Sequence, residues 1–257
     1  MESAFAAACP AAAHVLIESD RPDQELPDAV SVSGSDGHHL VRVRRLQVGE
    51  TVTAADGRGH WRPYLVGAVG DRTLELMATG PSRTEPVPMP GLAVAFALTK
   101  GVKPETVVRQ LTELGVDEIL PVIATRSIAR PRAERADAVG GRLERVAREA
   151  AMQCRRARLP RIAPLGPLAA LAGRPGLVIA ERGGPGTTGP PDPGRAGWLL
   201  VVGPEGGWAP EDLQALEGPG SDGGPARAVP RLAVGSHVLR AETAAVAAAA
   251  VLSAHRA

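Results

Sequence analysis

The sequence predicts an α/β protein in which a small strand-rich domain precedes a larger domain built on a parallel sheet. Its 257 residues are enough for one large domain or two modest ones. Residues 79–91 (TGPSRTEPVPMPG) contain four prolines and little periodicity, which is typical of a linker. Short alternating segments precede this linker, and apolar strands alternating with helical patterns follow it. The expected domains are therefore residues 1–80 and 81–257.

The N-terminal segments have the pattern of short strands. Apolar and polar residues alternate, or β-branched residues gather, between turns such as Val48-Gly49 and Asp56-Gly57. Together they predict a small β-barrel. The four expected strands are HLVRVRRL (39–46), ETVTAAD (50–56), WRPYLVGAV (61–69) and TLELMAT (73–79).

The C-terminal segments alternate between buried strands and helices. Pro104 suits a first helical turn, and the apolar residues after it mark one helix face before Gly115. Such alternation predicts a parallel sheet covered on both faces. The expected strands are 92–98, 116–124, 177–181, 198–202 and 226–234, and the expected helices are 104–114, 137–157, 210–217 and 241–255.

The composition excludes several classes of protein. Six aromatic residues are too few for a platform that stacks successive bases. Cys9 and Cys154 cannot form a disulfide framework, and the six histidines have no metal-binding spacing, so we expect a reducing compartment and no metal. The N-terminus lacks a basic region typical of a leader, and the longest apolar run, 244–252, is too short to cross a bilayer. We expect a cytoplasmic protein without a membrane partner.

Basic residues are concentrated in the middle of the chain. The formal net charge is +1, but residues 81–170 carry 15 basic and 9 acidic side chains. From 126 to 161 there are 11 arginines against 4 acids. This density favours contact with RNA phosphates, although a solvated helix face is the alternative.

Two glycine-rich segments differ in their structural context. The GPGTTG of 184–189 matches a dinucleotide-binding pattern, but prolines follow it, so no helix can receive a phosphate there. The GPEGG of 203–207 instead follows the apolar strand WLLVV and precedes a short helix. Glycines at the carboxyl end of a strand allow a ligand to approach the backbone closely, although a tight turn is the alternative.

A third segment, after the predicted strand 226–234, reaches Gly235 and then a helix start at Arg240, Glu242 and Thr243. Glutamate and threonine are favourable at such a position, but arginine opposes the helix dipole. This placement indicates a function for Arg240 elsewhere. The alternative is a salt bridge to Glu242 or Glu205.

The GPEGG segment together with LAVGSHVLRAETA (232–244) resembles the ribosomal RNA small subunit methyltransferase E family of the SPOUT class. The segments KGVK (100–103), 110–127 and 148–162 are similar to further family motifs, and 38–50 with 55–59 is similar to its N-terminal PUA-like barrel. The resemblance covers nearly the whole chain. Val234, Ser236, His237 and Ala241 stand where leucine, proline, arginine and threonine are typical of the family.

The resemblance implies a SPOUT-type parallel sheet with a C-terminal deep trefoil knot, preceded by a PUA-like barrel. It also implies a homodimer and transfer of a methyl group from S-adenosylmethionine to N3 of a uridine in 16S ribosomal RNA. The implied cofactor contacts are Ala180, Gly203, Glu205, Gly206, Gly207, Leu232, Val234, Gly235, Val238, Leu239 and Thr243. The expected RNA contacts are Arg42, Arg44, Arg45, Lys100, Lys103, Arg126, Arg155, Arg156 and Arg158.

This chemistry defines the expected catalytic residues. N3 of uracil must lose a proton, and the resulting anion needs stabilisation, for which Arg240 is the first candidate. The proton acceptor is either water or Glu205. Two other functions stay open: a non-catalytic RNA-binding protein of ribosome assembly, and a SPOUT methyltransferase that acts on transfer RNA.

Overall fold

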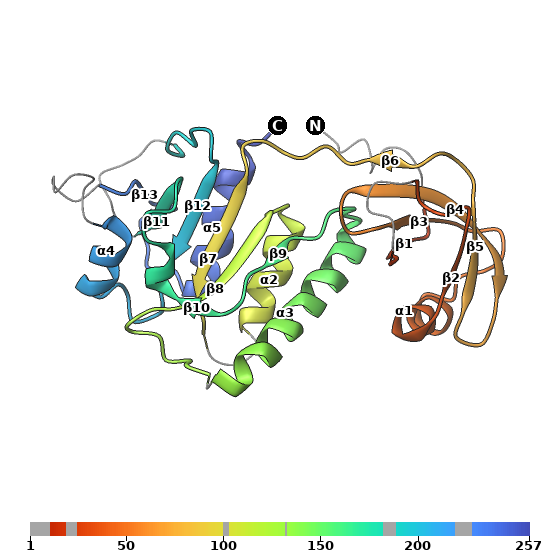
Figure 1. Ribbon diagram of the computed structural model, residues 1–257, viewed down its shortest axis with the longest axis horizontal. Coiled ribbons are helices and arrows are strands. Elements are labelled where there is room, and N and C mark those ends of the chain that lie inside the picture. Colours follow the sequence, from red (N-terminus) through yellow and green to blue (C-terminus); the bar gives the residue numbers. More distant parts are fainter. Residues whose placement is uncertain (1–10, 19–24, 100–102, 132, 182–188, 219–227) are drawn as a thin grey trace. The chain divides into compact units, whose positions relative to one another are not determined.

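The computed structural model describes residues 11–18, 25–99, 103–131, 133–181, 189–218 and 228–257. The chain forms two compact units (Figure 1). The first consists of Met1–Val87 with Arg148–Leu159, and the second of Pro88–Ala147 with Pro160–Ala257.

The first unit is built on a sheet with the strand order β1-β3-β4-β5-β2, and β6 pairs with β4. All of these pairs are antiparallel except β1 with β3. Tyr64 and Leu74 are fully buried in its core. The strands are β1 (Ala13–Leu16), β2 (Ala29–Val32), β3 (Thr51–Ala55), β4 (His60–Val69), β5 (Leu74–Ala78) and β6 (Arg83–Thr84).

The strand predicted over 39–46 is wrong. Residues 39–43 of this segment form the π-helix η1 (His39–Val43), which directly follows α1 (Gly34–His38), and residues 44–46 belong to no strand. Leu40 is buried beside the sheet, whereas Val43 is largely exposed. The alternation of apolar and basic residues in the sequence therefore does not correspond to two faces of a strand.

The second unit contains a sheet with the strand order β10-β8-β7-β12-β11-β13, and β9 pairs with β8. Every pair in this sheet is parallel, as the sequence predicted. The strands are β7 (Leu92–Ala97), β8 (Glu118–Ile123), β9 (Arg161–Ile162), β10 (Gly166–Pro167), β11 (Leu177–Ala180), β12 (Trp198–Val202) and β13 (Arg231–Leu232).

Helices cover both faces of this parallel sheet (Figure 1). Alternate residues of β7 divide between the two cores: Val94 and Phe96 pack with α2, α3 and α5, and Ala95 and Ala97 pack on the side of α4 and η2. The helices are α2 (Lys103–Glu113), α3 (Ala133–Cys154), η2 (Leu168–Leu171), α4 (Pro210–Glu217) and α5 (Ala241–Ser253).

The predicted strand 226–234 is shortened to Arg231–Leu232 in the described residues, and 226–227 lie outside them. Arg231 forms ion pairs with Glu181 and Glu217. Leu232 is buried. The two residues pair with Ile179 and Ala180 of β11, which is enough to place the following loop at the carboxyl end of the sheet.

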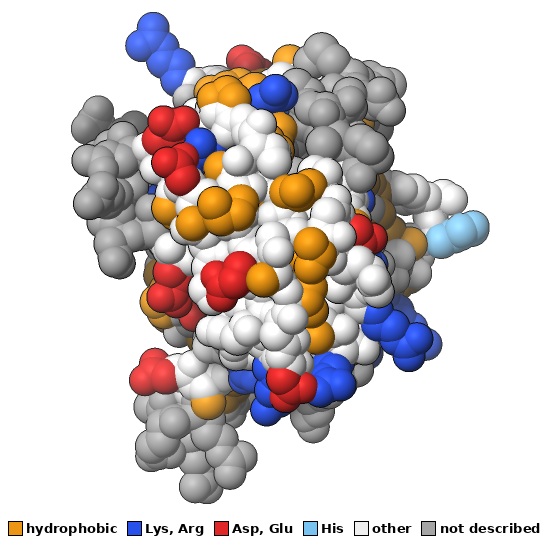
Figure 2. Space-filling view, turned by 90° about the vertical axis from the view of Figure 1, so that its right-hand side faces the viewer, with side chains coloured by type: hydrophobic (Ala, Val, Ile, Leu, Met, Phe, Trp, Pro, Cys, Tyr) orange, Lys and Arg blue, Asp and Glu red, His pale blue; other side chains and the backbone are white. Residues whose placement is uncertain are grey.

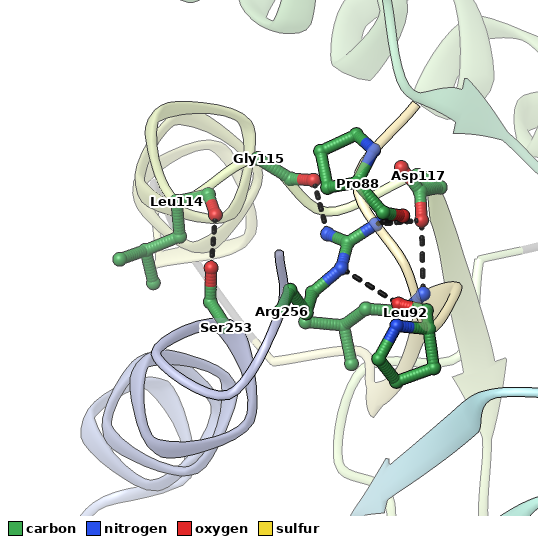
Figure 3. A network of polar contacts seen from close by, with 8 residues as sticks. Pro88, Leu92, Leu114, Gly115, Asp117, Ser253 and Arg256 are labelled. Atoms are coloured by element: carbon green, nitrogen blue, oxygen red, sulfur yellow. Dashed lines mark hydrogen bonds and ion pairs between the residues drawn. The ribbon is translucent and has the colours of Figure 1, made fainter. Parts of the chain in front are cut away.

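The C-terminal residues of the second unit are anchored by the buried Arg256 (Figure 3). Its guanidinium donates hydrogen bonds to the carbonyl oxygens of Pro88, Pro90 and Gly115 and pairs with the carboxylate of Asp117. Asp117 also accepts a hydrogen bond from the backbone N–H of Leu92 at 2.9 Å. This network joins the start of β7, the turn before β8 and the end of the chain.

A buried histidine in the core of the first unit makes the stability of that unit depend on pH. His14, 5% exposed, lies on β1 with Nδ1 2.8 Å from Thr53 Oγ1. Burial, followed by the charge of Arg155, lowers the pKa of His14 to about 4. Because this value lies below that of the unfolded chain, the unfolded state takes up the proton first as the pH falls, and stability is lost between pH 6.5 and 4.

We expect the free energy of unfolding of the first unit to fall by about 2 kcal/mol between pH 7 and pH 5 through this histidine. His14→Gln removes the titrating group, so its unfolding free energy should depend less on pH by that amount. Urea unfolding of both proteins at the two pH values measures the difference. Identical pH dependence would show that His14 makes no such contribution.

Candidate functional site

A cavity of about 470 Å³ lies at the carboxyl edge of the parallel sheet in the second unit. The loops after β11, β12 and β13 border it, together with the beginning of α5. The lining residues are Ala180, Glu181, Val202, Gly203, Pro204, Glu205, Gly207, Trp208, Leu213, Val234, Gly235, His237, Val238, Leu239, Ala241 and Ala244.

Strand pairing explains why these distant segments meet. β11 pairs in parallel with β12 on one side and with β13 on the other. Ile179 is opposite Val201 of β12, and Ala180 is opposite Leu232 of β13. Since the carboxyl ends of parallel strands point to the same edge, the loops that begin near Gly203 and Val234 approach each other there.

The GPEGG loop depends on the properties of glycine at two positions. A Cβ on Gly203 would lie 3.0 Å from the indole ring of Trp208, so a larger residue would displace the ring. Gly207 has φ of +71°, which side chains disfavour. Trp208 Nε1 donates a hydrogen bond of 3.4 Å to the carbonyl oxygen of Ala180. The ring thereby joins the loop after β12 to the end of β11.

Most of the expected cofactor contacts lie in this cavity. Eight of them line it: Ala180, Gly203, Glu205, Gly207, Val234, Gly235, Val238 and Leu239. Three are placed elsewhere. The carbonyl oxygen of Gly206 accepts a hydrogen bond from Arg126, Leu232 is buried in the core, and Thr243 is exposed in the first turn of α5.

Sequence reasoning missed Trp208, Glu181 and His237 among the lining residues. Trp208 directly follows the GPEGG segment. This position beside the glycines could have identified it from the sequence as a lining residue. His237 stands where arginine is typical of the family, and in the structure it lines the cavity.

Lys103, at the start of α2, connects two carboxylates beside the cavity. Its Nζ lies 3.3 Å from Glu205 Oε1 and 3.3 Å from Glu242 Oε1. Burial by itself raises the pKa of Glu242, but its own backbone N–H and the Lys103 ammonium outweigh that effect and lower the pKa. Arg240 adds a smaller contribution in the same direction.

Arg240 is exposed and occupies the residue directly before α5. Within the described part of the chain, its guanidinium has no hydrogen bond or ion pair. The alternative of a salt bridge to Glu205 or Glu242 is therefore wrong here, because Lys103 holds both carboxylates. The exposed guanidinium is therefore accessible to solvent.

The arginines around the end of α3 are engaged within the first unit. Arg155 donates a hydrogen bond of 2.6 Å to the carbonyl oxygen of Ala11, and Arg158 donates one of 3.3 Å to that of Glu85. Arg156 is buried at 9% exposure. Burial raises the pKa of Glu85, while the charge of Arg156 opposes that shift. These contacts stabilise the fold of the unit.

Other expected RNA contacts are more accessible. Arg42 pairs with Asp71, and Arg44 donates to the carbonyl oxygen of Ala12. Arg45 and Arg126 are exposed, and Arg126 lies beside Gly206 of the glycine-rich loop. Lys100 lies outside the described residues.

Two searches of the described residues found nothing. Over those ranges, no three side chains of histidine, cysteine, aspartate or glutamate come together in a metal-binding group. Nor does any helix described here combine the length and apolar character that crossing a bilayer requires.

The geometry agrees with comparisons to known proteins. A model of the RNA methyltransferase domain matches residues 86–253, and one of the RNA methyltransferase PUA domain matches residues 32–76. Ribosomal RNA small subunit methyltransferase E of Mycobacterium tuberculosis is 32% identical over 235 residues, covering 87% of this chain and 86% of that protein. The chain belongs to the ribosomal RNA small subunit methyltransferase E family.

Further similar proteins extend this comparison. The Synechocystis protein of the same name is 29% identical over 250 residues, 91% of this chain and 75% of its own length. The crystal structure of the Neisseria gonorrhoeae methyltransferase E bound to S-adenosyl methionine has a TM-score of 0.78 at 22% identity, covering 94% of this chain and 97% of that chain. A Legionella pneumophila methyltransferase in complex with the same cofactor has a TM-score of 0.75 at 24% identity, with 94% and 96% covered. These structures share the fold.

Proposed function

We propose that this protein transfers a methyl group from S-adenosylmethionine to N3 of a uridine in 16S ribosomal RNA. The observation that carries the proposal is the cavity at the carboxyl edge of the sheet. It is formed by the two segments, GPEGG and LAVGSHVLRAETA, on which the family resemblance rests. Relatives with this family name act on ribosomal RNA, and two structural neighbours contain the cofactor.

The cavity has the properties that S-adenosylmethionine requires. Its volume lies within the range of small-molecule sites, roughly 300–1,000 Å³. Glycines at 203, 207 and 235 expose backbone groups that can bind adenine and carboxylate, and Val234 and Leu239 provide apolar walls. When bound, the cofactor supplies a methyl group that is already activated, so the protein contributes mainly positioning.

The residues at the cavity can perform the remaining steps. Glu205 lines the cavity and is the proposed acceptor of the N3 proton, with water as the alternative. Arg240 is the proposed stabiliser of the negative charge that develops on a uracil oxygen, because its guanidinium is not occupied by either neighbouring carboxylate. A uridine paired or stacked in the RNA must be splayed out to reach them.

Each unit by itself offers an exposed arginine as a proposed RNA contact: Arg45 in the segment matched by the PUA domain, and Arg126 beside the glycine-rich loop. Figure 2 shows one face on which apolar and acidic side chains are interspersed and basic side chains lie in separate groups near the upper and lower margins.

Family membership supports three further parts of the proposal. The first domain, residues 1–80, closes into a PUA-like barrel, and the second, residues 81–257, carries a C-terminal trefoil knot. Two copies form a homodimer in the manner of the SPOUT class. The contiguous parallel sheet and the return of the chain from β12 to β13 across β11 are compatible with such a knot.

The proposed reaction is tested by mapping its product. Purified protein, S-adenosylmethionine and small ribosomal subunits from a strain lacking the enzyme should yield 3-methyluridine at one position of 16S RNA. Nuclease digestion and mass spectrometry identify both the nucleoside and its place. Methylation of transfer RNA instead, or cofactor binding with no product on any RNA, would support the alternative functions.

A substitution at Gly235 tests the place of the cofactor. A Cβ there meets no atom within 4 Å, but the φ of +157° disfavours a side chain, so valine both strains the loop and fills space beside the cavity. Gly235→Val should weaken S-adenosylmethionine binding at least about tenfold, or 1.4 kcal/mol, by calorimetry. Gly173→Val is the control, because Gly173 also has a positive φ, +69°, with open space around it, and it lies outside the cavity lining. Unchanged affinity in Gly235→Val would exclude this loop as the cofactor site.

The role of Arg240 gives a kinetic prediction. Arg240→Ala should lower single-turnover methyl transfer by roughly 10²–10³-fold, the effect of losing one donor to an oxyanion. Cofactor and RNA affinities should change much less, because the interaction strengthens as the N3 proton leaves. Arg240→Lys should recover little, since an ammonium lacks the planar fork of guanidinium. A large fall in melting temperature with near-normal chemistry would instead indicate a structural role.

A further inference from the structure

Lys103 joins α2 to two elements that border the cavity. It belongs to the first turn of α2, Glu205 to the loop after β12, and Glu242 to the first turn of α5. The side chains are partly shielded, with 36%, 32% and 20% exposed for the lysine and the two glutamates. A single ammonium therefore bridges two carboxylates that approach it from different segments.

We infer that Lys103 is a positioning residue of the methyl transfer: by holding both glutamates, it leaves the guanidinium of Arg240 free to contact the substrate. This inference rests on the proposed function. It assigns to Lys103 a role different from the phosphate contact expected from sequence.

The competition between the two cations follows from the positions of the groups. Arg240 precedes Glu242 by two residues, and its charge already lowers the pKa of that carboxyl. Glu242 Oε2 is buried and has no hydrogen-bond partner within the described ranges. A buried carboxylate oxygen without a donor is unfavourable, so it offers a ready acceptor to any nearby guanidinium.

Removing the Lys103 charge would leave two carboxylates close together without their shared cation. Like charges repel, and Arg240 is the remaining cation close to Glu242. The guanidinium is then expected to turn toward Glu242, where it forms a charge-assisted hydrogen bond. In that position its donors are no longer available to the uracil oxygen.

The decisive experiment compares single and double variants. Lys103→Met should lower single-turnover methyl transfer at saturating cofactor and RNA by roughly 10–100-fold, approaching the loss of one oxyanion donor. Adding Glu242→Gln should restore at least about tenfold of this loss, because the neutral amide competes weakly for Arg240. Lys103→Arg, which keeps the positive charge, should stay within about fivefold of the natural protein.

Arg109→Met is the matched control, because Arg109 is an exposed basic residue on the same helix. It should leave the single-turnover rate unchanged. A Lys103 that serves only as a phosphate contact would give a higher KM for RNA, a normal rate at saturation and no recovery in the double variant. A purely structural Lys103 would give a lower melting temperature, and Glu242→Gln would not restore turnover. Either pattern overturns the inference.

Misfolding of Lys103→Met and failure of the proposed function can both be distinguished from failure of the inference. If Lys103→Met does not fold, the double variant and Lys103→Arg are judged alone. Both must then stay within about tenfold of the natural turnover, and a double variant as inactive as Arg240→Ala contradicts the inference. Failure of the proposed function is distinguishable, because the natural protein itself would then bind no S-adenosylmethionine by calorimetry or methylate no RNA.

Discussion

The parallel pairing of β11 with both β12 and β13 determines the geometry of the site. After β12 the chain forms the glycine-rich loop and α4 on one side of β11, and it returns to pair on the other side. Two loops distant in sequence thereby share one edge of the sheet. The cavity is a consequence of this strand order, and the side chains of the loops then determine what it can bind.

The second unit was predictable because its strands are continuous apolar runs. WLLVV is predicted and found over the same residues, 198–202, since a strand buried on both faces needs no alternation. The first unit was harder. Its β1 and β2 have four residues each with little distinctive pattern, and the segment at 39–46 alternates like a strand but forms a helical turn. Packing of Leu40 against the sheet decides that conformation.

The backbone segments that form the site could be predicted from the sequence, whereas the partners of its charged side chains could not. Glycine motifs at strand ends identified the cavity loops, because close approach of backbone leaves a local signal. The partners of charged residues leave no such signal. Arg156 and Arg158 look like a basic cluster in the sequence, yet one is buried and the other contacts a backbone carbonyl. Their partners come from segments far away along the chain, so only the fold could identify them.

The difference between lysine and arginine clarifies the arrangement at the cavity. The chain contains 27 arginines and two lysines, yet lysine occupies position 103. A compact ammonium with three rotatable donors can serve two carboxylates arriving from different directions, whereas guanidinium favours planar, bidentate partners. Arg240, with its planar fork, is suited to a flat base such as uracil. The two positions thus differ in what they require: the positive charge at 103 bridges two carboxylates, whereas the contact proposed for Arg240 depends on the planar guanidinium.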